Sequence, residues 1–194
     1  LLVGDLLAHP DQYVSGQDEI RGLVLPVSFS RCFSILEREI LLFDPDVVMA
    51  FGLASGRSGA VELERVAINF IDSASPDNDG QILRDRCVES HGPAAYFSTL
   101  PLRTMLKSLQ AAEIPAAISH SAGSYVCNSL FYQLQAATLR SRRYCGFVHF
   151  PYLPEQAKNK TPLPPSMPLL QMQGAVKEMI KALRFNLIPS SASI

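Results

Sequence analysis

Short apolar runs that alternate with stretches of helical period are the feature that most constrains the fold of this chain. The segment Asp46–Gly52 places an apolar run after an acidic turn, a pattern typical of a strand that is buried on both faces. Ser30–Phe43 carries its apolar residues at the spacing of a helix. Strands that alternate with helices favour a sheet covered by helices. The sequence therefore predicts an α/β sandwich with a mixed or parallel sheet.

The same reasoning assigns the other segments. Further strands are predicted at Gly22–Val27, Pro115–Ser119 and Gly146–Phe150, and the segment Glu64–Phe70 is rich in β-forming residues. Further helices are predicted at Leu102–Ala112, Tyr125–Leu139 and Leu169–Phe185. Pro76–Gly80 is predicted as a turn and Pro151–Pro168, with six of the chain's 14 prolines, as a loop. We expect one domain over residues 1–194, with a disordered tail after Pro189.

Composition excludes several classes of protein. The net charge is −1 and the charged residues are scattered, so nothing indicates a nucleic-acid partner. No apolar run reaches membrane-spanning length, and the opening LLVGDLLAHPDQ lacks the basic start of a signal peptide. The four cysteines show no C-x-x-C spacing. We therefore expect a protein of the reducing cytosol, although spacing alone leaves open a pairing of the cysteines.

Cys127 is the first candidate for a reactive group. A short strand runs into Ser121-Ala122-Gly123-Ser124, after which a helix begins, so Cys127 is predicted in or near the first helical turn. The free N–H groups and the positive dipole end there favour a thiolate and could hold an oxyanion. The alternative is that Cys127 is a small buried hydrophobic residue, as most free cysteines are.

Two further residues could complete a catalytic set. His149 lies near the end of an apolar strand, at the edge where α/β proteins bind ligands, and could act as general base and acid. Glu64 could fix the tautomer of that imidazole. Each also has a plainer interpretation: His149 as a core histidine, and Glu64 as an exposed residue paired with Arg65. His120 is a possible rival base in the turn that precedes the helix.

Four stretches together resemble the pyroglutamyl peptidase I family, also called pyrrolidone carboxyl peptidases. The first joins GLASGRS (residues 52–58) to ERVAIN (64–69), and the second is PDNDGQ (76–81). The third is GPAAYFSTLP (92–101), and the fourth joins SAGSYVCN (121–128) to GFVHFPYLP (146–154). The resemblance runs from about Leu23 to the last helix. It implies a three-layer α/β/α sandwich around a mixed, largely parallel sheet, and a catalytic triad of Glu64, Cys127 and His149.

The resemblance also implies the activity. It identifies a thiol protease that hydrolyses the bond after an N-terminal pyroglutamate through a thioacyl-enzyme, with no metal or organic cofactor. It further implies a cytoplasmic homotetramer whose substrates are pyroglutamyl peptides. Because pyroglutamate is a neutral lactam, we expect an apolar pocket with a few polar anchors. Tyr125 and Val126 are its expected walls, with Leu53 and Ser75 as further substrate-binding candidates.

Two departures from the family pattern are visible. The family's N-terminal strand and its GFEPFGG-like loop, whose phenylalanines sandwich the lactam, are not recognisable; we expect an incomplete sequence, because the triad is intact. Family members often read DDARIPDN with an Arg near the oxyanion, where this chain has Ala74, and Ser75 replaces the Ile. The segment between Gly52 and Glu64 is also one residue longer than usual.

These departures keep two alternatives open. One is a catalytically impaired paralogue that binds peptide termini or serves a structural role. The other is a redox-sensing protein that pairs Cys127 with Cys145, which predicts a disulfide under mild oxidation.

Overall fold

The computed structural model describes residues 2–14, 18–54, 58–139, 141 and 143–187. Its centre is a four-stranded sheet in the order β1-β6-β2-β5. The strands are β1 (Val47–Leu53), β2 (Val61–Glu64), β5 (Ala116–Ser119) and β6 (Tyr144–Phe150). β1 pairs parallel with β6, and β2 pairs parallel with β5, whereas β2 and β6 are antiparallel. A separate antiparallel pair is formed by β3 (Val66–Ile68) and β4 (Ala95–Phe97).

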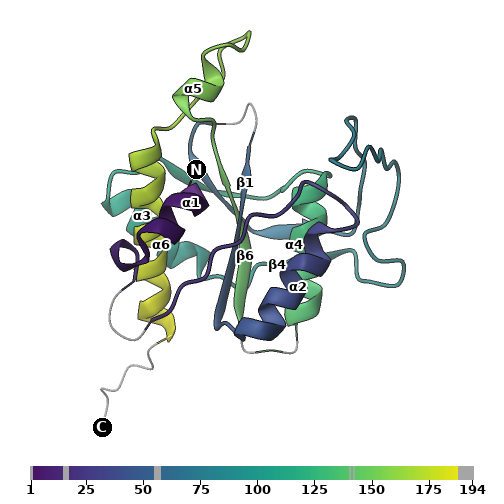
Figure 1. Cartoon of the computed structure of the whole chain (residues 1–194), viewed down its shortest axis with the longest axis horizontal. Helices are drawn as coiled ribbons and strands as arrows, with labels where there is room; N and C mark the ends of the chain where they lie inside the picture. Colours follow the sequence, from purple (N-terminus) through teal and green to yellow (C-terminus); the bar gives the residue numbers. More distant parts are fainter. Residues whose placement is uncertain (1, 15–17, 55–57, 140, 142, 188–194) are drawn as a thin grey trace.

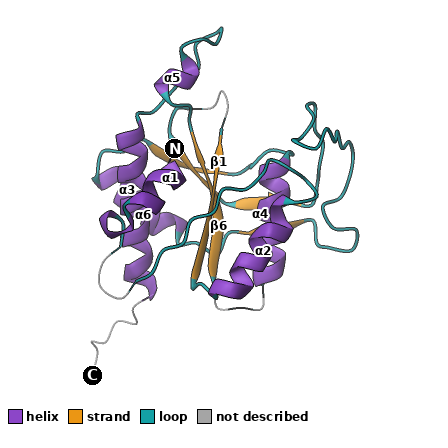
Figure 2. Ribbon diagram, viewed as in Figure 1, coloured by secondary structure: helices purple, strands orange, loops and turns teal. Residues whose placement is uncertain are grey.

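Helices cover both faces of the central sheet. Figure 1 shows α1 (Leu2–Ala8), α3 (Leu102–Ala111) and α6 (Leu169–Leu187) on one side, and α2 (Cys32–Phe43) and α4 (Val126–Thr138) on the other. Figure 2 shows the strands enclosed between these two helical layers. A 3-10 helix (Pro10–Gln12) follows α1, and the short α5 (Pro154–Ala157) projects beyond the sheet. The predicted three-layer α/β/α sandwich with a mixed, largely parallel sheet is confirmed.

Two apolar clusters hold the layers together. α6 buries Met172, Ala175, Val176, Met179, Ala182 and Leu183. This spacing of three and four residues gives one apolar stripe, which packs with α3 against the sheet. The second cluster lies on the opposite face and combines residues of α2 and α4 with Phe147 of β6. β6 lies between β1 and β2, and its residues from Cys145 to Phe150 are all buried.

Most predicted elements agree with the structure, and three need correction. The strand predicted at Gly22–Val27 is wrong: the segment is irregular, Leu23 and Val24 are both exposed, and Pro26 has no N–H to donate to a ladder. Of the segment Glu64–Phe70, only Glu64 belongs to β2, which begins three residues earlier at Val61, and the chain enters β3 at Val66. The predicted loop Pro151–Pro168 contains α5.

Some predictions fall on residues outside this description, and some elements of the structure were not predicted. The tail after Pro189, and Ser55, Gly56 and Arg57 of the glycine-rich stretch, lie outside the described residues. The strand β4 and the helix α1 were not predicted. None of the helices within the described ranges is long and apolar enough to cross a bilayer.

Asn128 fastens α4 to the small sheet. Its side chain is fully buried, and its Oδ1 accepts the N–H of Ile68 at 3.0 Å. Its Nδ2 donates to the carbonyl groups of Ile68 at 2.9 Å and Phe70 at 3.0 Å. One amide therefore satisfies three backbone groups and fixes the start of α4 relative to β3.

We expect Asn128→Ala to lower the free energy of unfolding by roughly 2–4 kcal/mol, because three backbone groups lose their hydrogen bonds to a buried side chain. Urea unfolding followed by circular dichroism measures this change. Gln110→Ala, at an exposed position on α3, is the matched control and is expected to stay within about 0.5 kcal/mol of the parent. A loss at Asn128 no larger than that of the control would contradict the role of this anchor.

Candidate functional site

A buried carboxylate–imidazole pair lies at the centre of the sheet. Side chains alternate between the faces of a strand, so Glu64 of β2 shares a face with Phe147 and His149 of β6. Glu64 is opposite Phe147 in the antiparallel register, and the diagonal neighbour is His149. The distance between His149 Nδ1 and Glu64 Oε1 is 2.7 Å, and the two side chains are 4% and 0% exposed.

Cys127 is the second residue of α4 and is partly buried. Its side chain interacts with His149. Burial alone would disfavour the charged imidazole, but hydrogen bonding and charge from Cys127 and Glu64 outweigh it and raise the pKa of His149 to about 9. The structure thus brings the three triad candidates into one interacting group.

Local geometry explains how Cys127 comes to a helix start. Gly123 has a φ of 81°, a left-handed conformation that favours glycine, so the chain turns sharply before the helix. Tyr125 has extended backbone at the N-cap position and provides no side-chain cap. The first N–H groups of α4 have no acceptor within the helix, because none precedes them. They are donors in the same helical turn as Cys127.

A loop lies alongside this helix start. The N–H of Asp72 donates to the carbonyl of Ser124 at 3.1 Å, and Ser124 Oγ donates to the carbonyl of Asp72 at 2.7 Å. Tyr125 Oη donates to the carbonyl of Pro76 at 2.8 Å. Both ends of the segment 72–76 are therefore tied to the residues before Cys127. Ala74 and Ser75, within this segment, are exposed.

The other substrate-binding candidates differ in exposure. Leu53 ends β1 and is 45% exposed. Val126 is 4% exposed and packs in the cluster with Phe147, so its side chain is part of the core. Tyr125 is partly buried, and burial together with the charges of Asp77 and Cys127 raises the pKa of its phenol. Tyr125 is thus the pocket candidate with the most direct relation to the nucleophile.

Sequence reasoning missed Phe29. Its ring meets that of Tyr125 edge to face, with 5.3 Å between the centroids and an interplanar angle of 85°. Asp77 Oδ2 accepts the N–H of Phe29 at 2.9 Å. Asn78 and Val27 exchange two hydrogen bonds of 2.8 Å, one through the Asn78 side chain. The only signal in the sequence was the Asp77-Asn78 turn, since such residues bind nearby backbone, but their partners are some fifty residues away.

Glu62 is a second acidic residue near His149 that the sequence reasoning did not single out. It is 8% exposed and lies directly opposite His149 in the antiparallel register. Ser58 Oγ donates to Glu62 Oε1 at 3.1 Å. The rival base His120 is exposed. Among the described residues, no three His, Cys, Asp or Glu side chains are arranged to hold a metal ion.

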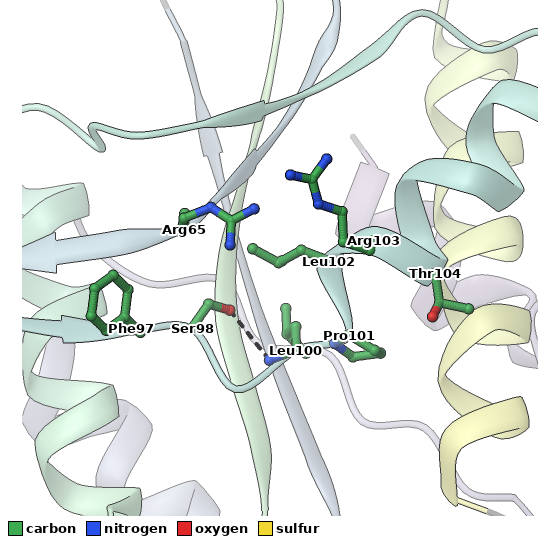
Figure 3. A pocket seen from close by; sticks show the side chains of 8 residues that line it. All are labelled: Arg65, Phe97, Ser98, Leu100, Pro101, Leu102, Arg103 and Thr104. Carbon is green, nitrogen blue, oxygen red and sulfur yellow. Dashed lines mark hydrogen bonds between the residues drawn. The ribbon is translucent and has the colours of Figure 1, made fainter.

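A cavity of about 290 Å³ lies away from the triad candidates. Figure 3 shows the guanidinium groups of Arg65 and Arg103 projecting into it. Its other lining residues come from the end of β4 and the start of α3; they are Phe97, Ser98, Leu100, Pro101, Leu102 and Thr104. Glu64, Cys127 and His149 are not among the residues that line it. This cavity is therefore distinct from the site around Cys127.

Comparisons with known proteins agree with this geometry. The family model described as pyroglutamyl peptidase matches residues 8–185. Pyrrolidone-carboxylate peptidase from Pyrococcus furiosus is 41% identical over 171 residues, covering 86% of this chain and 82% of the relative. The protein of the same name from Levilactobacillus brevis is 38% identical over 164 residues, covering 84% of this chain and 78% of the relative.

Solved structures give the same result. Pyrrolidone carboxyl peptidase from Thermococcus litoralis has a TM-score of 0.87 and 32% identity, covering all of this chain and 92% of that chain. Pyroglutamyl peptidase I from Bacillus amyloliquefaciens has a TM-score of 0.84 and 33% identity, covering 92% of this chain and 84% of that chain. The resemblance noted in the sequence is confirmed: the chain belongs to the pyroglutamyl peptidase family.

Proposed function

We propose that this protein is a cysteine peptidase that removes an N-terminal pyroglutamate from peptides, with Cys127 as nucleophile, His149 as general base and acid, and Glu64 as the residue that orients His149. The observation that carries the proposal is the interaction of a buried Glu64–His149 pair with a cysteine at a helix start. The family membership supports the same activity, which the relatives' names state for them.

Each protonation state in the reaction follows from this arrangement. The Glu64 carboxylate accepts a hydrogen bond from Nδ1–H of His149, which leaves Nε2 to exchange a proton with the sulfur. Because the pKa of His149 is raised to about 9, the imidazole holds a proton at neutral pH. The added proton, on Nε2, is the one that the Cys127 thiol gives up, so the resting pair is a thiolate beside an imidazolium.

The reaction has two halves. The Cys127 thiolate attacks the pyroglutamyl carbonyl carbon, a C–S bond forms, and N–H groups at the start of α4 hold the oxyanion. The C–N bond then breaks while the imidazolium of His149 protonates the departing amine, which leaves a thioester. In the second half His149 takes a proton from water, and the resulting hydroxide attacks the thioester. The C–S bond breaks, which restores the thiolate and the imidazolium, and the released pyroglutamic acid loses its carboxyl proton to solvent.

The lactam pocket is proposed to form around Tyr125. Val126, Leu53 and Ser75 are the other residues that the resemblance suggests, and Phe29 joins them because its ring contacts Tyr125. Val126 contributes through its backbone, since its side chain is in the core. An aromatic wall suits the flat, neutral lactam ring.

We also propose a cytosolic protein that acts as a homotetramer, as the resemblance implies. The four cysteines support a reducing compartment, because all are free thiols. Cys145 is fully buried and its Sγ lies 2.7 Å from Thr138 Oγ1, so a disulfide with Cys127 is not favoured. The impaired paralogue is also not favoured, because the Glu64–His149 pair is in contact.

Cys127→Ala is expected to lower the release of a dye from a pyroglutamyl-linked substrate by at least about 10³-fold, because the covalent step loses its nucleophile. Iodoacetamide should inactivate the parent with one label per chain when Cys87 is first changed to Ser, since Cys32 and Cys145 are buried and Cys87 is exposed. Cys87→Ser alone should keep full activity. Activity that survives in Cys127→Ala would exclude the proposed nucleophile.

Ala74→Arg is expected to raise kcat, by up to about 10²-fold, because a guanidinium at this position adds a donor for the oxyanion. The segment 72–76 is fixed beside Ser124 and Tyr125, and Ala74 is exposed, so the longer side chain has room. Ala74→Met is the control of similar length without a donor. An equal response to Arg and Met would contradict the assignment.

The pH dependence of kcat/KM should have an alkaline limb near pH 9, where the imidazolium of His149 loses its proton. Glu64→Gln removes the negative charge that helps to raise this pKa, so the limb should move to lower pH. Titration of the four histidine imidazoles by NMR measures the same pKa directly. A limb that stays in place or moves to higher pH in Glu64→Gln would contradict the pairing.

A further inference from the structure

We propose that Gly52 and Phe147 are positioning residues that fix the plane of the His149 imidazole, Gly52 by leaving space beside the ring and Phe147 by packing against it. This inference rests on the proposed function, since it concerns the proposed base. It adds a second constraint to the hydrogen bond that His149 donates to Glu64, which fixes only one edge of the ring.

The space beside Gly52 is already filled by the two rings. Gly52 of β1 is the register partner of His149 in the parallel pair β1–β6. A Cβ on Gly52 would lie 2.7 and 2.8 Å from Cε1 and Cζ of Phe147 and 3.0 Å from Cδ2 of His149. Gly52 does not have a positive φ, so its backbone does not require glycine. The requirement is space for the rings.

Phe147 cannot move aside to accept a methyl group. It is 1% exposed, and its centroid lies 4.8 Å from that of His149 and 6.0 Å from that of Phe131 on α4. Interiors of this kind are closely packed, so strain at one ring passes to the next. A methyl group at residue 52 must therefore press the His149 imidazole away from its present position.

A small displacement of that ring would reach both of its partners. The Nδ1–Oε1 distance of 2.7 Å leaves little freedom before the hydrogen bond to Glu64 weakens. Rotation of the imidazole about this hydrogen bond would also turn Nε2 away from Cys127. The geometry thus assigns to Gly52 and Phe147 the alignment of proton transfer, a step in which a misplacement of about 1 Å is costly.

Gly52→Ala tests this assignment, with Gly146→Ala as a matched control. Gly146 lies in β6, and a Cβ there would also be crowded, at 2.4 Å from Ser98 Oγ and 2.6 Å from Leu100 Cδ1, but it would not meet His149. Gly52→Ala should lower kcat about 10- to 10²-fold with little change in KM, and should move the alkaline limb and the NMR titration of His149 to lower pH. Gly146→Ala should lower stability while leaving the limb in place.

A reciprocal variant separates crowding from general damage. Phe147→Leu removes the ring edge nearest Gly52, so the double variant Gly52→Ala/Phe147→Leu should be more active than Gly52→Ala alone. Phe147→Leu by itself should also shift the alkaline limb of the pH profile, because the imidazole loses the ring that packs against it. If Gly52→Ala does not fold, Phe147→Leu alone decides, and an unshifted limb overturns the proposal. Unchanged kcat and limb in folded Gly52→Ala overturn it also. The NMR titration remains decisive even if the parent releases no pyroglutamate, so the two proposals fail separately.

Discussion

The hydrogen bond between Glu64 and His149 is the interaction on which the rest of this structure depends. A carboxylate and an imidazole buried in a sheet would each be costly alone, because burial disfavours charge. Here the antiparallel register of β2 and β6 places the two groups diagonally on one face, and each compensates the other. A shift of one residue would turn Glu64 to the opposite face and leave Leu63 towards the imidazole. The mixed sheet, with β6 between β1 and β2, therefore serves the site as well as the core.

The nucleophile reaches this pair from a different part of the chain. Cys127 is carried by α4, whose start is fixed by Asn128 to the backbone of Ile68, while Tyr125 and Ser124 are tied to the segment 72–76. The base and acid are thus rigid and buried in strands, whereas the sulfur is partly exposed at a helix end. This division suits their roles, because a base must be held in one tautomer and a nucleophile must be reached by substrate.

The sequence predicted the layers and the triad candidates because both leave strong local signals. The apolar runs around Val48 and Val148 indicate buried strands, and the ordered motifs around Glu64, Cys127 and His149 indicate the family. It could not predict the approach of Phe29 to Tyr125, because the hydrogen bonds to Asp77 and Asn78 that fix this segment span 48 and 51 residues. The same contacts explain why Gly22–Val27 is not a strand: the segment leads into Val27 and Phe29, which bind the loop at Asp77, and contributes no strand to the sheet.

The side chains of β2 alternate between the two faces of the sheet, so the packing of the core on one face affects the catalytic candidates on the other. Val61 and Leu63 are fully buried in the cluster with α3 and α6, while Glu62 and Glu64 face the other side. The packing of Leu63 on the opposite face of the sheet therefore fixes the position of Glu64. Val148 and Phe150, the buried neighbours of His149 on β6, fix the position of His149 in the same way. Since closely packed side chains transmit strain, a cavity opened at Leu63 would shift a strand that carries the acid. In this fold the apolar packing on one face of the sheet controls hydrogen-bond geometry on the other.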